Sequence, residues 1–290
     1  MKITVVGVGL LGGSFALIAK EKGVASKVTG VDINPLHAER ALALGIADEM
    51  LSLEDAVKDT DLVVLATSVN VLLKQLPQVL DLVKEHTIVM DLGSTKELIC
   101  KMVDNHPKRT QFVASHPIAG TENSGPDAAF PGLLKKKIMI ICDKEKSSKH
   151  ALETVVSLSK LFDMRLSFMN AAAHDRHLAY VSHLSHISSF ALGITVLDKE
   201  KDEKSIFEMA GSGFSSTVRL AKSSPDMWAP IFTQNKENIS TALGAYIRRL
   251  QAFKDIIDSN DESRSKELML HANEIRRVLL GIDNPSQSSG

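Results

Sequence analysis

The chain has 290 residues, 44% of them hydrophobic and 24% charged, which is typical of a globular protein and enough for two domains of ordinary size. Its formal net charge of −1 gives no global basic field, so we do not expect a nucleic-acid partner. No apolar run approaches the roughly 18 residues needed to cross a bilayer, so we expect no membrane segment.

The cysteines and the first residues bear on the compartment. Cys100 and Cys142 are the only cysteines, lie far apart in the sequence and fit no metal-ligand spacing. The first two residues lead directly into a predicted strand, so we expect no signal peptide. These features together predict a reduced, cytoplasmic location.

The first 32 residues carry the strongest pattern in the sequence. An apolar strand is predicted at residues 3–6, and it runs directly into Gly7-Val8-Gly9-Leu10-Leu11-Gly12. A helix at residues 14–22 and a second strand at residues 28–31 follow, and that strand ends on Asp32. Placed between a strand and a helix, the glycines form the dinucleotide-binding fingerprint.

Each part of this fingerprint has a physical role. Gly7 permits the tight turn, Gly9 lets a pyrophosphate approach the backbone, and Gly12 lets helix and strand pack closely. Asp32 is spaced to bind both ribose hydroxyls, and its carboxylate would repel a 2′-phosphate, which predicts NAD as the cofactor. The expected cofactor-binding residues are Gly7, Gly9, Leu10, Leu11, Gly12 and Asp32.

Strand and helix signals alternate through the first 168 residues. After the first two strands, residues 62–66 form a short, wholly apolar run typical of a strand buried on both faces. Further strands are predicted at residues 87–90, 112–114, 138–141 and 165–168. This alternation predicts an α/β fold whose N-terminal part is a Rossmann-type, doubly wound and mostly parallel sheet with helices on both faces.

From Asn170 onward the strand signals stop and helical periodicity dominates. Asn170 is a predicted N-cap for a long helix over residues 171–197. We therefore expect a dinucleotide-binding domain at 1–169, an all-α substrate and dimerisation domain at 170–282, and a flexible tail at 283–290. Because the helical domain alone would have a thin core, we expect it to form a homodimer.

Residues that follow strands are the first candidates for chemistry, because a dinucleotide lies across the carboxyl ends of the strands in such a sheet. Two polar clusters qualify, at residues 91–96 and 115–122. His116 in the second cluster is able to accept a proton from a substrate hydroxyl, the partner step of hydride removal. From its position alone, a hydrogen-bonded structural histidine is an equally good interpretation.

Four histidines, His174, His177, His183 and His186, lie within the predicted long helix. On a regular α-helix the first two share one face and the last two share nearly the opposite face. Pairs spaced i, i+3 are able to bind zinc, but no HExxH motif, nearby cysteine or suitably spaced acid completes a tetrahedral set. We therefore expect no metal.

A third cluster, residues 209–221, is rich in glycine and serine. Arg219 lies on the helix that follows, where an arginine is a candidate for bidentate capture of a carboxylate. The alternative is an arginine in an ordinary surface ion pair. Trp228, the only tryptophan, is predicted to belong to the core rather than to contact a ligand.

Six segments of the chain resemble the prephenate dehydrogenase family of tyrosine biosynthesis, and together they extend over nearly the whole chain. They are GVGLLGGS near the N-terminus, DLGSTK at 91–96, SHPIAGTE at 115–122, HDRHLAYVSHLSH at 174–186, GSGFSSTVRLAKSSPDMW at 211–228 and FTQNKENI at 232–239. The resemblance implies an enzyme that uses NAD to convert prephenate to 4-hydroxyphenylpyruvate and carbon dioxide. It also implies that His116 is the catalytic histidine and that Ser94 orients that histidine and the substrate.

The resemblance also implies the residues that bind the substrate. Arg219 matches the arginine that anchors a substrate carboxylate, His183 and His186 match histidines that line the pocket, and Glu122 matches an acid at its mouth. In one place the chain departs from the family. Ser215-Ser216 stand where members often have a basic–acidic pair, so an ion pair gating the site through that acid is not expected here.

Three alternatives stay open. Some members of the family act on the amino analogue arogenate. Another Rossmann dehydrogenase, of the 6-phosphogluconate-dehydrogenase-like group, would need a catalytic lysine followed by an asparagine one helical turn later, a spacing that Lys236 and Asn238 do not keep. A non-catalytic dinucleotide sensor would show no convergence of His116 and Arg219.

Overall fold

The computed structural model describes residues 1–283, so the predicted tail at 283–290 lies almost entirely outside the described residues. Two compact units are distinguished, Met1–Ile239 and the segment that begins at Ser240. The predicted domain boundary at residue 169 falls inside the first unit and stays a prediction. In the described part of the chain, no helix combines the length and the apolar character that crossing a membrane requires.

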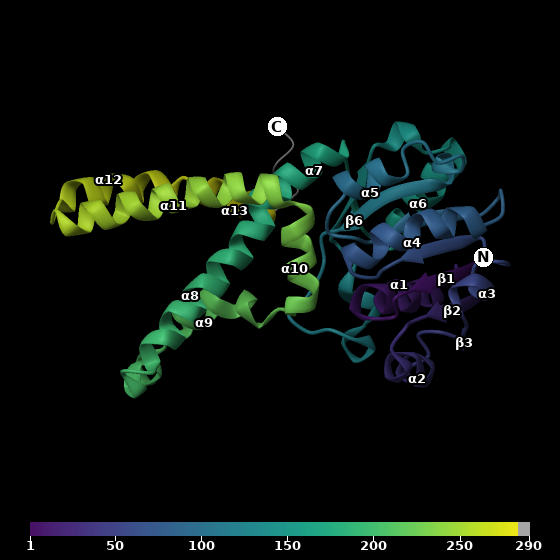
Figure 1. Cartoon of the computed structure of the whole chain (residues 1–290), viewed down its shortest axis with the longest axis horizontal. Helices are drawn as coiled ribbons and strands as arrows, with labels where there is room; N and C mark the ends of the chain where they lie inside the picture. The colour runs from purple at the N-terminus through teal and green to yellow at the C-terminus, as the bar shows by residue number, and fades with distance from the viewer. Residues whose placement is uncertain (284–290) are drawn as a thin grey trace. The chain divides into compact units, whose positions relative to one another are not determined.

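The first unit contains one eight-stranded sheet (Figure 1). Its spatial order is β3-β2-β1-β4-β5-β6-β7-β8, and all neighbours are parallel except β6 and β7. The order reverses direction between β1 and β4, which is where the nucleotide site of a doubly wound sheet lies. The strands are β1 Lys2–Val6, β2 Lys27–Val31, β3 Glu49–Met50, β4 Leu62–Leu65, β5 Ile88–Asp91, β6 Phe112–Pro117, β7 Ile138–Cys142 and β8 Arg165–Met169.

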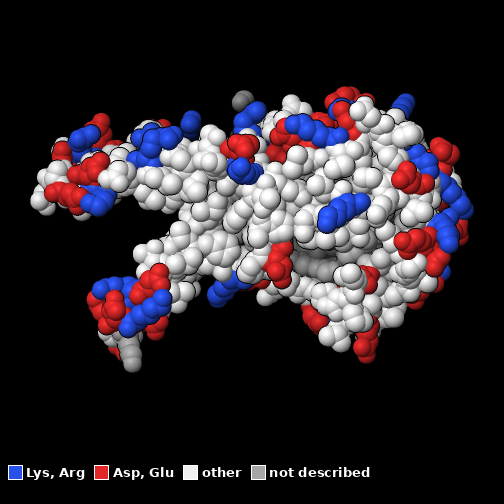
Figure 2. Space-filling model, viewed as in Figure 1, with Lys and Arg blue, Asp and Glu red and all other residues white. Residues whose placement is uncertain are grey.

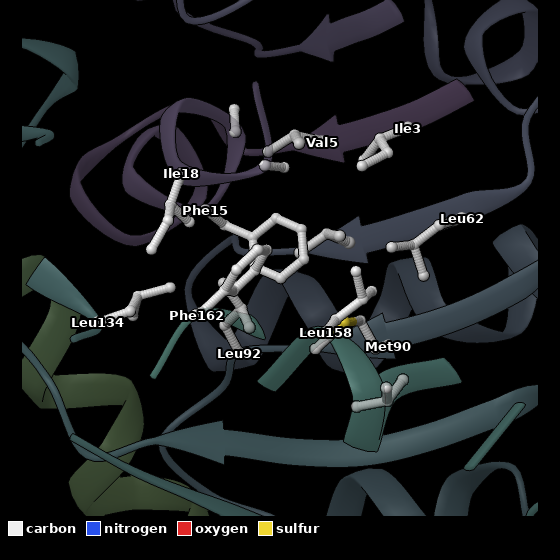
Figure 3. Close-up of a cluster of buried hydrophobic side chains, with 14 of the residues drawn as sticks. Ile3, Val5, Phe15, Ile18, Leu62, Met90, Leu92, Leu134, Leu158 and Phe162 are labelled. Carbon is white, nitrogen blue, oxygen red and sulfur yellow. The ribbon is translucent and has the colours of Figure 1, made fainter. Parts of the chain in front are cut away.

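Helices cover both faces of this sheet, because the strand residues alternate between two separate apolar cores. One core joins Val5 of β1 to Phe15 and to Phe162, whose rings meet edge to face at 5.3 Å between centroids (Figure 3). The other core joins Val63 of β4 to Leu76 on the opposite side. The helices of this part are α1 Leu10–Glu21, α2 Pro35–Ala43, α3 Leu53–Ala56, α4 Val69–Leu82, α5 Glu97–Met102 and α6 Lys149–Leu161.

Beyond β8 the described residues contain α-helices and no strand. This helical part and the mostly parallel sheet together confirm the predicted α/β fold class. The Asn170 side chain accepts a hydrogen bond from the Ala173 N–H and caps the first of these helices, as predicted. The helices are α7 Ala171–Leu178, α8 Leu184–Glu200, α9 Ser212–Val218, α10 Pro225–Gln234, α11 Lys236–Asp258, α12 Glu262–Asn273 and α13 Arg276–Asp283. On the face drawn in Figure 2, basic and acidic side chains are interspersed rather than gathered by sign.

Two sequence predictions about elements near the site are wrong. The strand predicted at 112–114 extends through Pro117, because its residues continue to pair with antiparallel β7. The long helix predicted at 171–197 is interrupted by a π-helical turn, Ala179–His183, before α8 continues to Glu200. Such a turn inserts an extra residue, which rotates every later side chain by about 100° relative to a regular helix.

Candidate active site

The turn between β1 and α1 requires glycine at its first position. Gly7 has a φ of +91°, and a Cβ there would lie 2.8 Å from the carbonyl oxygen of Ala66. A Cβ at Gly12 would lie 2.0 Å from the Gly7 carbonyl oxygen, so only glycine lets α1 pack this closely on the turn. The two glycines therefore hold the start of α1 at the carboxyl end of β1.

The start of α1 is open to a ligand. A Cβ at Gly9 would meet nothing within 4 Å, and no side chain caps the helix at this residue. Leu10 and Leu11 are the first two residues of α1 and are half-buried. The first N–H groups of a helix have no partner within it, and its positive dipole end favours anions, so these residues fit a pyrophosphate.

Asp32 lies at the end of β2 beside this turn, and its side chain is 11% exposed. Its carboxylate accepts hydrogen bonds from the Val8 N–H at 3.1 Å and the Asn34 N–H at 2.9 Å. These bonds hold the carboxylate beside the glycine-rich turn. His37 was not predicted from the sequence, and its Nδ1 lies 3.8 Å from the carboxylate.

His116 lies within β6 rather than after it, and its backbone pairs with Ile140 of β7. Its side chain is largely buried and takes part in a chain of hydrogen bonds. Nδ1 of His116 lies 2.9 Å from Nε2 of His174, and Nδ1 of His174 lies 2.7 Å from an Asp175 oxygen. Rigid secondary structure therefore holds the candidate base from two sides, through β6 and α7.

Burial determines the protonation state of this pair. Desolvation lowers the pKa of His116 well below its ordinary value, and electrostatic interactions with His174 and Lys96 lower it further. Burial also lowers the pKa of His174, although the neighbouring Asp175 carboxylate opposes the effect. Both imidazoles are therefore neutral at pH 7, and a neutral imidazole is able to accept a proton.

A buried ion pair lies beside these histidines. Asp91, the last residue of β5, pairs with the Lys96 ammonium group, and both side chains are fully buried. The same carboxylate accepts hydrogen bonds from the Gly93 N–H at 2.9 Å and the Ser115 N–H at 3.0 Å. These bonds join the end of β5 to the part of β6 that carries the candidate base.

Ser94 lies next to this pair and is half-buried. Among the described residues, no hydrogen bond joins its hydroxyl to His116, and the group that does bond the imidazole is His174. The orienting role that the resemblance implies for Ser94 therefore stays a prediction.

A second part of the network leads from Asp175 toward the other predicted pocket residues. The Asn235 amide donates to the Asp175 carbonyl oxygen at 2.7 Å and lies 3.1 Å from Nδ1 of His183. His183 packs edge-on against Trp228, and His186 stacks on the same indole with 3.6 Å between ring centroids. Burial lowers the pKa of His183 to about 4 and also lowers that of His186.

Arg219 follows directly after α9, and its positive charge contributes to lowering the pKa of His186. Its guanidinium is 3.6 Å from the Glu122 carboxylate, and the two side chains are 55% and 35% exposed. Ser215 and Ser216 of α9 are exposed. Hydrogen bonds and ring contacts thus form a series from His116 to His186, and Arg219 forms a separate pair with Glu122. An imidazole is able to act as a base, and a guanidinium is able to bind a carboxylate.

The π-helical turn changes how the four helical histidines are distributed. His174 and His183, predicted on nearly opposite faces, are both buried. His177 lies in α7 before the π-helical turn and is exposed, so its place three residues after His174 does not give it the same burial. Within residues 1–283, no group of three or more histidine, cysteine, aspartate or glutamate side chains is arranged to hold a metal ion.

Several residues of this network were missed from the sequence. His174 was predicted only as one of four helical histidines. The acidic residue directly after it, Asp175, was a sequence signal for the hydrogen bond that the two side chains form. Lys96 belongs to the polar cluster at 91–96, but its pairing with Asp91 was not predicted. Asn235 gave no local signal, because its partners Asp175 and His183 are distant in the sequence. Trp228 was predicted to belong to the core, and it is buried, but it also stacks on a predicted pocket histidine.

Two family models match the chain. Residues 15–167 match the nucleotide-binding domain of prephenate dehydrogenase, and residues 170–271 match its dimerization domain. Together they cover most of the chain.

Individual relatives agree with these models. A prephenate dehydrogenase of Bacillus subtilis is 32% identical over 262 residues, which is 89% of this chain and 71% of the relative. The structure of a prephenate dehydrogenase from A. aeolicus, in complex with hydroxyphenyl propionate and NAD+, is 32% identical and superposes with a TM-score of 0.85 over 96% of this chain and 98% of that one. An arogenate dehydrogenase from Synechocystis is 25% identical, with a TM-score of 0.75 over 96% of this chain and 100% of that one.

Proposed function

The chain belongs to the prephenate dehydrogenase family, and from this premise we propose that it oxidises and decarboxylates prephenate to 4-hydroxyphenylpyruvate in tyrosine biosynthesis. The observation that carries the proposal is a buried, neutral His116 that is bonded to His174, and through it to Asp175, in a chain of this family. It is an NAD-dependent oxidoreductase, and bound NAD+ supplies the hydride acceptor.

His116 is the proposed catalytic base. Its neutral imidazole takes the proton of the ring hydroxyl as the hydride is removed from the same ring carbon. The ring carboxylate departs as carbon dioxide, its electron pair makes the ring aromatic, and the imidazolium returns the proton to the ring oxygen. Aromatisation makes the step strongly favourable, so the enzyme's main tasks are to orient the substrate and to accept this proton. Ser94 is proposed to contact the reacting end of the substrate as well.

Arg219 is the proposed anchor for a substrate carboxylate. Prephenate is a dianion, and a guanidinium pairs two carboxylate oxygens at once. His183, His186 and Glu122 are proposed to line the same pocket, which the stacking of His186 on Trp228 supports. The anchor must hold the side-chain carboxylate without hindering departure of the ring carboxylate.

Arogenate is the second candidate substrate, which the likeness to the Synechocystis enzyme favours. It differs from prephenate by an amino group in place of the side-chain keto group. Formation of reduced cofactor is measured at 340 nm with each substrate in turn, and the proposal predicts a higher kcat/KM with prephenate. A higher kcat/KM with arogenate would establish the second candidate, and no reaction with either would favour a dinucleotide sensor.

Asp32 makes NAD+ the preferred form of the cofactor over NADP+. A carboxylate bonded to two backbone N–H groups at this place would repel a 2′-phosphate. We expect kcat/KM to be higher with NAD+ by about tenfold or more, and Asp32→Asn to narrow that gap. Equal or better efficiency of the wild-type enzyme with NADP+ would contradict this part of the proposal.

The organisation of the protein belongs to the same proposal. Residues 1–169 would bind the dinucleotide, and residues 170–282 would bind substrate and form a homodimer. The match to a dimerization domain and the exposed apolar side chains of α11 and α12 support the dimer: Ile247, Leu250, Ile257, Met269 and Leu270. Light scattering of the purified chain would give the mass of two copies, and a single-copy mass would contradict the proposed dimer.

The two free thiols, Cys100 and Cys142, fit the reduced cytoplasm that we propose as the location of the protein.

A further inference from the structure

The Asp175 carboxylate is surrounded by hydrogen-bond donors. It accepts the N–H of Lys96 at 2.7 Å and that of Glu97 at 2.9 Å, one on each oxygen, at the beginning of α5. The third group within hydrogen-bond distance is Nδ1 of His174, at 2.7 Å. An ionised carboxylate only accepts hydrogen bonds, so His174 must donate through Nδ1.

This donation fixes the tautomer of His174. The side chain is fully buried, and burial lowers its pKa, so the ring is neutral and carries one proton. That proton is on Nδ1, and therefore Nε2 carries a lone pair and acts as an acceptor. The only group that the described residues bring to this lone pair is Nδ1 of His116, at 2.9 Å.

The same reasoning then applies to His116. Because its neighbour accepts, Nδ1 of His116 must be the donor and must carry the single proton of the neutral ring. Its other ring nitrogen, Nε2, has no hydrogen-bond partner among residues 1–283. A neutral histidine in this tautomer presents a free lone pair on Nε2, which is the atom able to take a proton from a substrate.

We propose that Asp175 and His174 are positioning residues that fix the tautomer of His116, so that Nε2 is the basic atom in the reaction. The proposal rests on the proposed function, in which His116 is the base. It adds a series of hydrogen bonds, from the Asp175 carboxylate through the His174 imidazole to the His116 imidazole, that is complete before substrate binds. When Nε2 takes the hydroxyl proton, the imidazolium that forms keeps its Nδ1 hydrogen bond to His174, and no other proton has to move.

The groups around the two imidazoles are compatible with Nε2 of His116 as the basic atom. The charged or titratable groups that face the two imidazoles are Lys96 of the turn before α5, Asp91 of β5, Asp175 of α7 and His183 of the π-helical turn. Lys96 and Asp91 compensate each other in a buried pair. Among residues 1–283, Asp175 is therefore the one carboxylate that is hydrogen-bonded directly to either imidazole.

The decisive experiment is nitrogen NMR of the enzyme labelled with ¹⁵N at its histidine rings, in the absence of substrate. The His116 signals are identified by their loss in His116→Asn. In the wild-type enzyme at pH 7.5 we expect a protonated Nδ1 and an unprotonated Nε2. In His174→Phe, which removes the acceptor but keeps a ring, we expect the proton of His116 to move to Nε2.

Kinetics test the consequence for the reaction. His174→Phe should lower kcat by about 100-fold with little change in the KM for prephenate, the pattern of a base held in the wrong tautomer. His174→Gln supplies an amide oxygen as an alternative acceptor and should recover a large part of kcat. His177→Phe, a matched change at an exposed position of the same helix, should leave both the NMR signals and kcat unchanged.

These outcomes separate the inference from the proposed function. A wild-type His116 protonated on Nε2 would overturn the inference whatever the substrate, because the NMR measurement uses none. A His174→Phe enzyme that keeps kcat within about twofold would overturn it as well. If His174→Phe does not fold, the wild-type tautomer and the His174→Gln variant decide the question. A correct tautomer together with no turnover of prephenate would leave the inference standing and remove the proposed function.

Discussion

The two ends of the proposed site are built in opposite ways. His116, His174 and Asp175 are each at most 8% exposed and are joined by bonds of 2.7 to 2.9 Å. Arg219 is 55% exposed, and its contact with Glu122 is 3.6 Å long. The fold therefore holds the proposed base in place before substrate arrives, whereas the proposed anchor stays hydrated until a substrate covers it. A solvated ion pair of that kind contributes at most about 1 kcal/mol.

The largest effect is expected at the buried end. His116→Asn should lower kcat by about 10²–10⁴-fold, because no other group in the described network is positioned to take the hydroxyl proton. Affinity for NAD+, measured by fluorescence titration, should stay nearly unchanged, because the glycine-rich turn is separate from the imidazole. If the variant keeps most of its turnover, His116 is a structural histidine. The difference between a buried base and an exposed anchor would then have no meaning for catalysis.

An intermediate effect is expected at the exposed end, and it should be on KM rather than on kcat. Arg219→Ala should raise the KM for prephenate by about 30-fold or more, since loss of one partner from a desolvated charge pair costs roughly 2–5 kcal/mol. Arg219→Lys should recover only part, because an ammonium lacks the planar fork that pairs two oxygens. An unchanged KM in steady-state assays would establish the surface ion pair instead.

The smallest effect is expected from Glu122→Gln. The contact of Glu122 with Arg219 is long and solvated, so its loss should change the KM for prephenate by less than about fivefold. The difference from wild type should shrink further in 0.5 M salt, which screens exposed charges. A change as large as that of Arg219→Ala, or one insensitive to salt, would indicate that the pair is desolvated in the working enzyme.

Much of the nucleotide-binding half was predictable because its signals are local. The glycine-rich turn, Asp32 and the buried strands each follow from residues close together in the sequence, and the observed sheet agrees with them. The end of β6 was not predictable in this way. His116 belongs to the strand only because β7 returns antiparallel beside it, and that pairing depends on residues far along the chain.

The helical half shows a second limit of sequence reasoning. The histidine segment was interpreted with regular helical periodicity, and the π-helical turn made that interpretation wrong for the placement of His183 relative to His174. The partners of His174 come from β6 and from its own neighbour, Asp175, and only the neighbour was visible in the sequence. Prediction therefore identified most of the proposed residues but not the hydrogen bonds that give them their chemistry.

The acid side of the pH profile tests the central claim most directly. Because kcat/KM reports ionisations of the free enzyme, it is the quantity to compare with this structure. Burial lowers the pKa of His116 well below the ordinary 6.5, so the base stays neutral and active at pH 6.5 and is lost only as the pH falls further. The account predicts a single acid limb in kcat/KM for prephenate, with an apparent pKa below 6.5. An acid limb at or above 6.5, or a rate that rises as the pH falls, would contradict it.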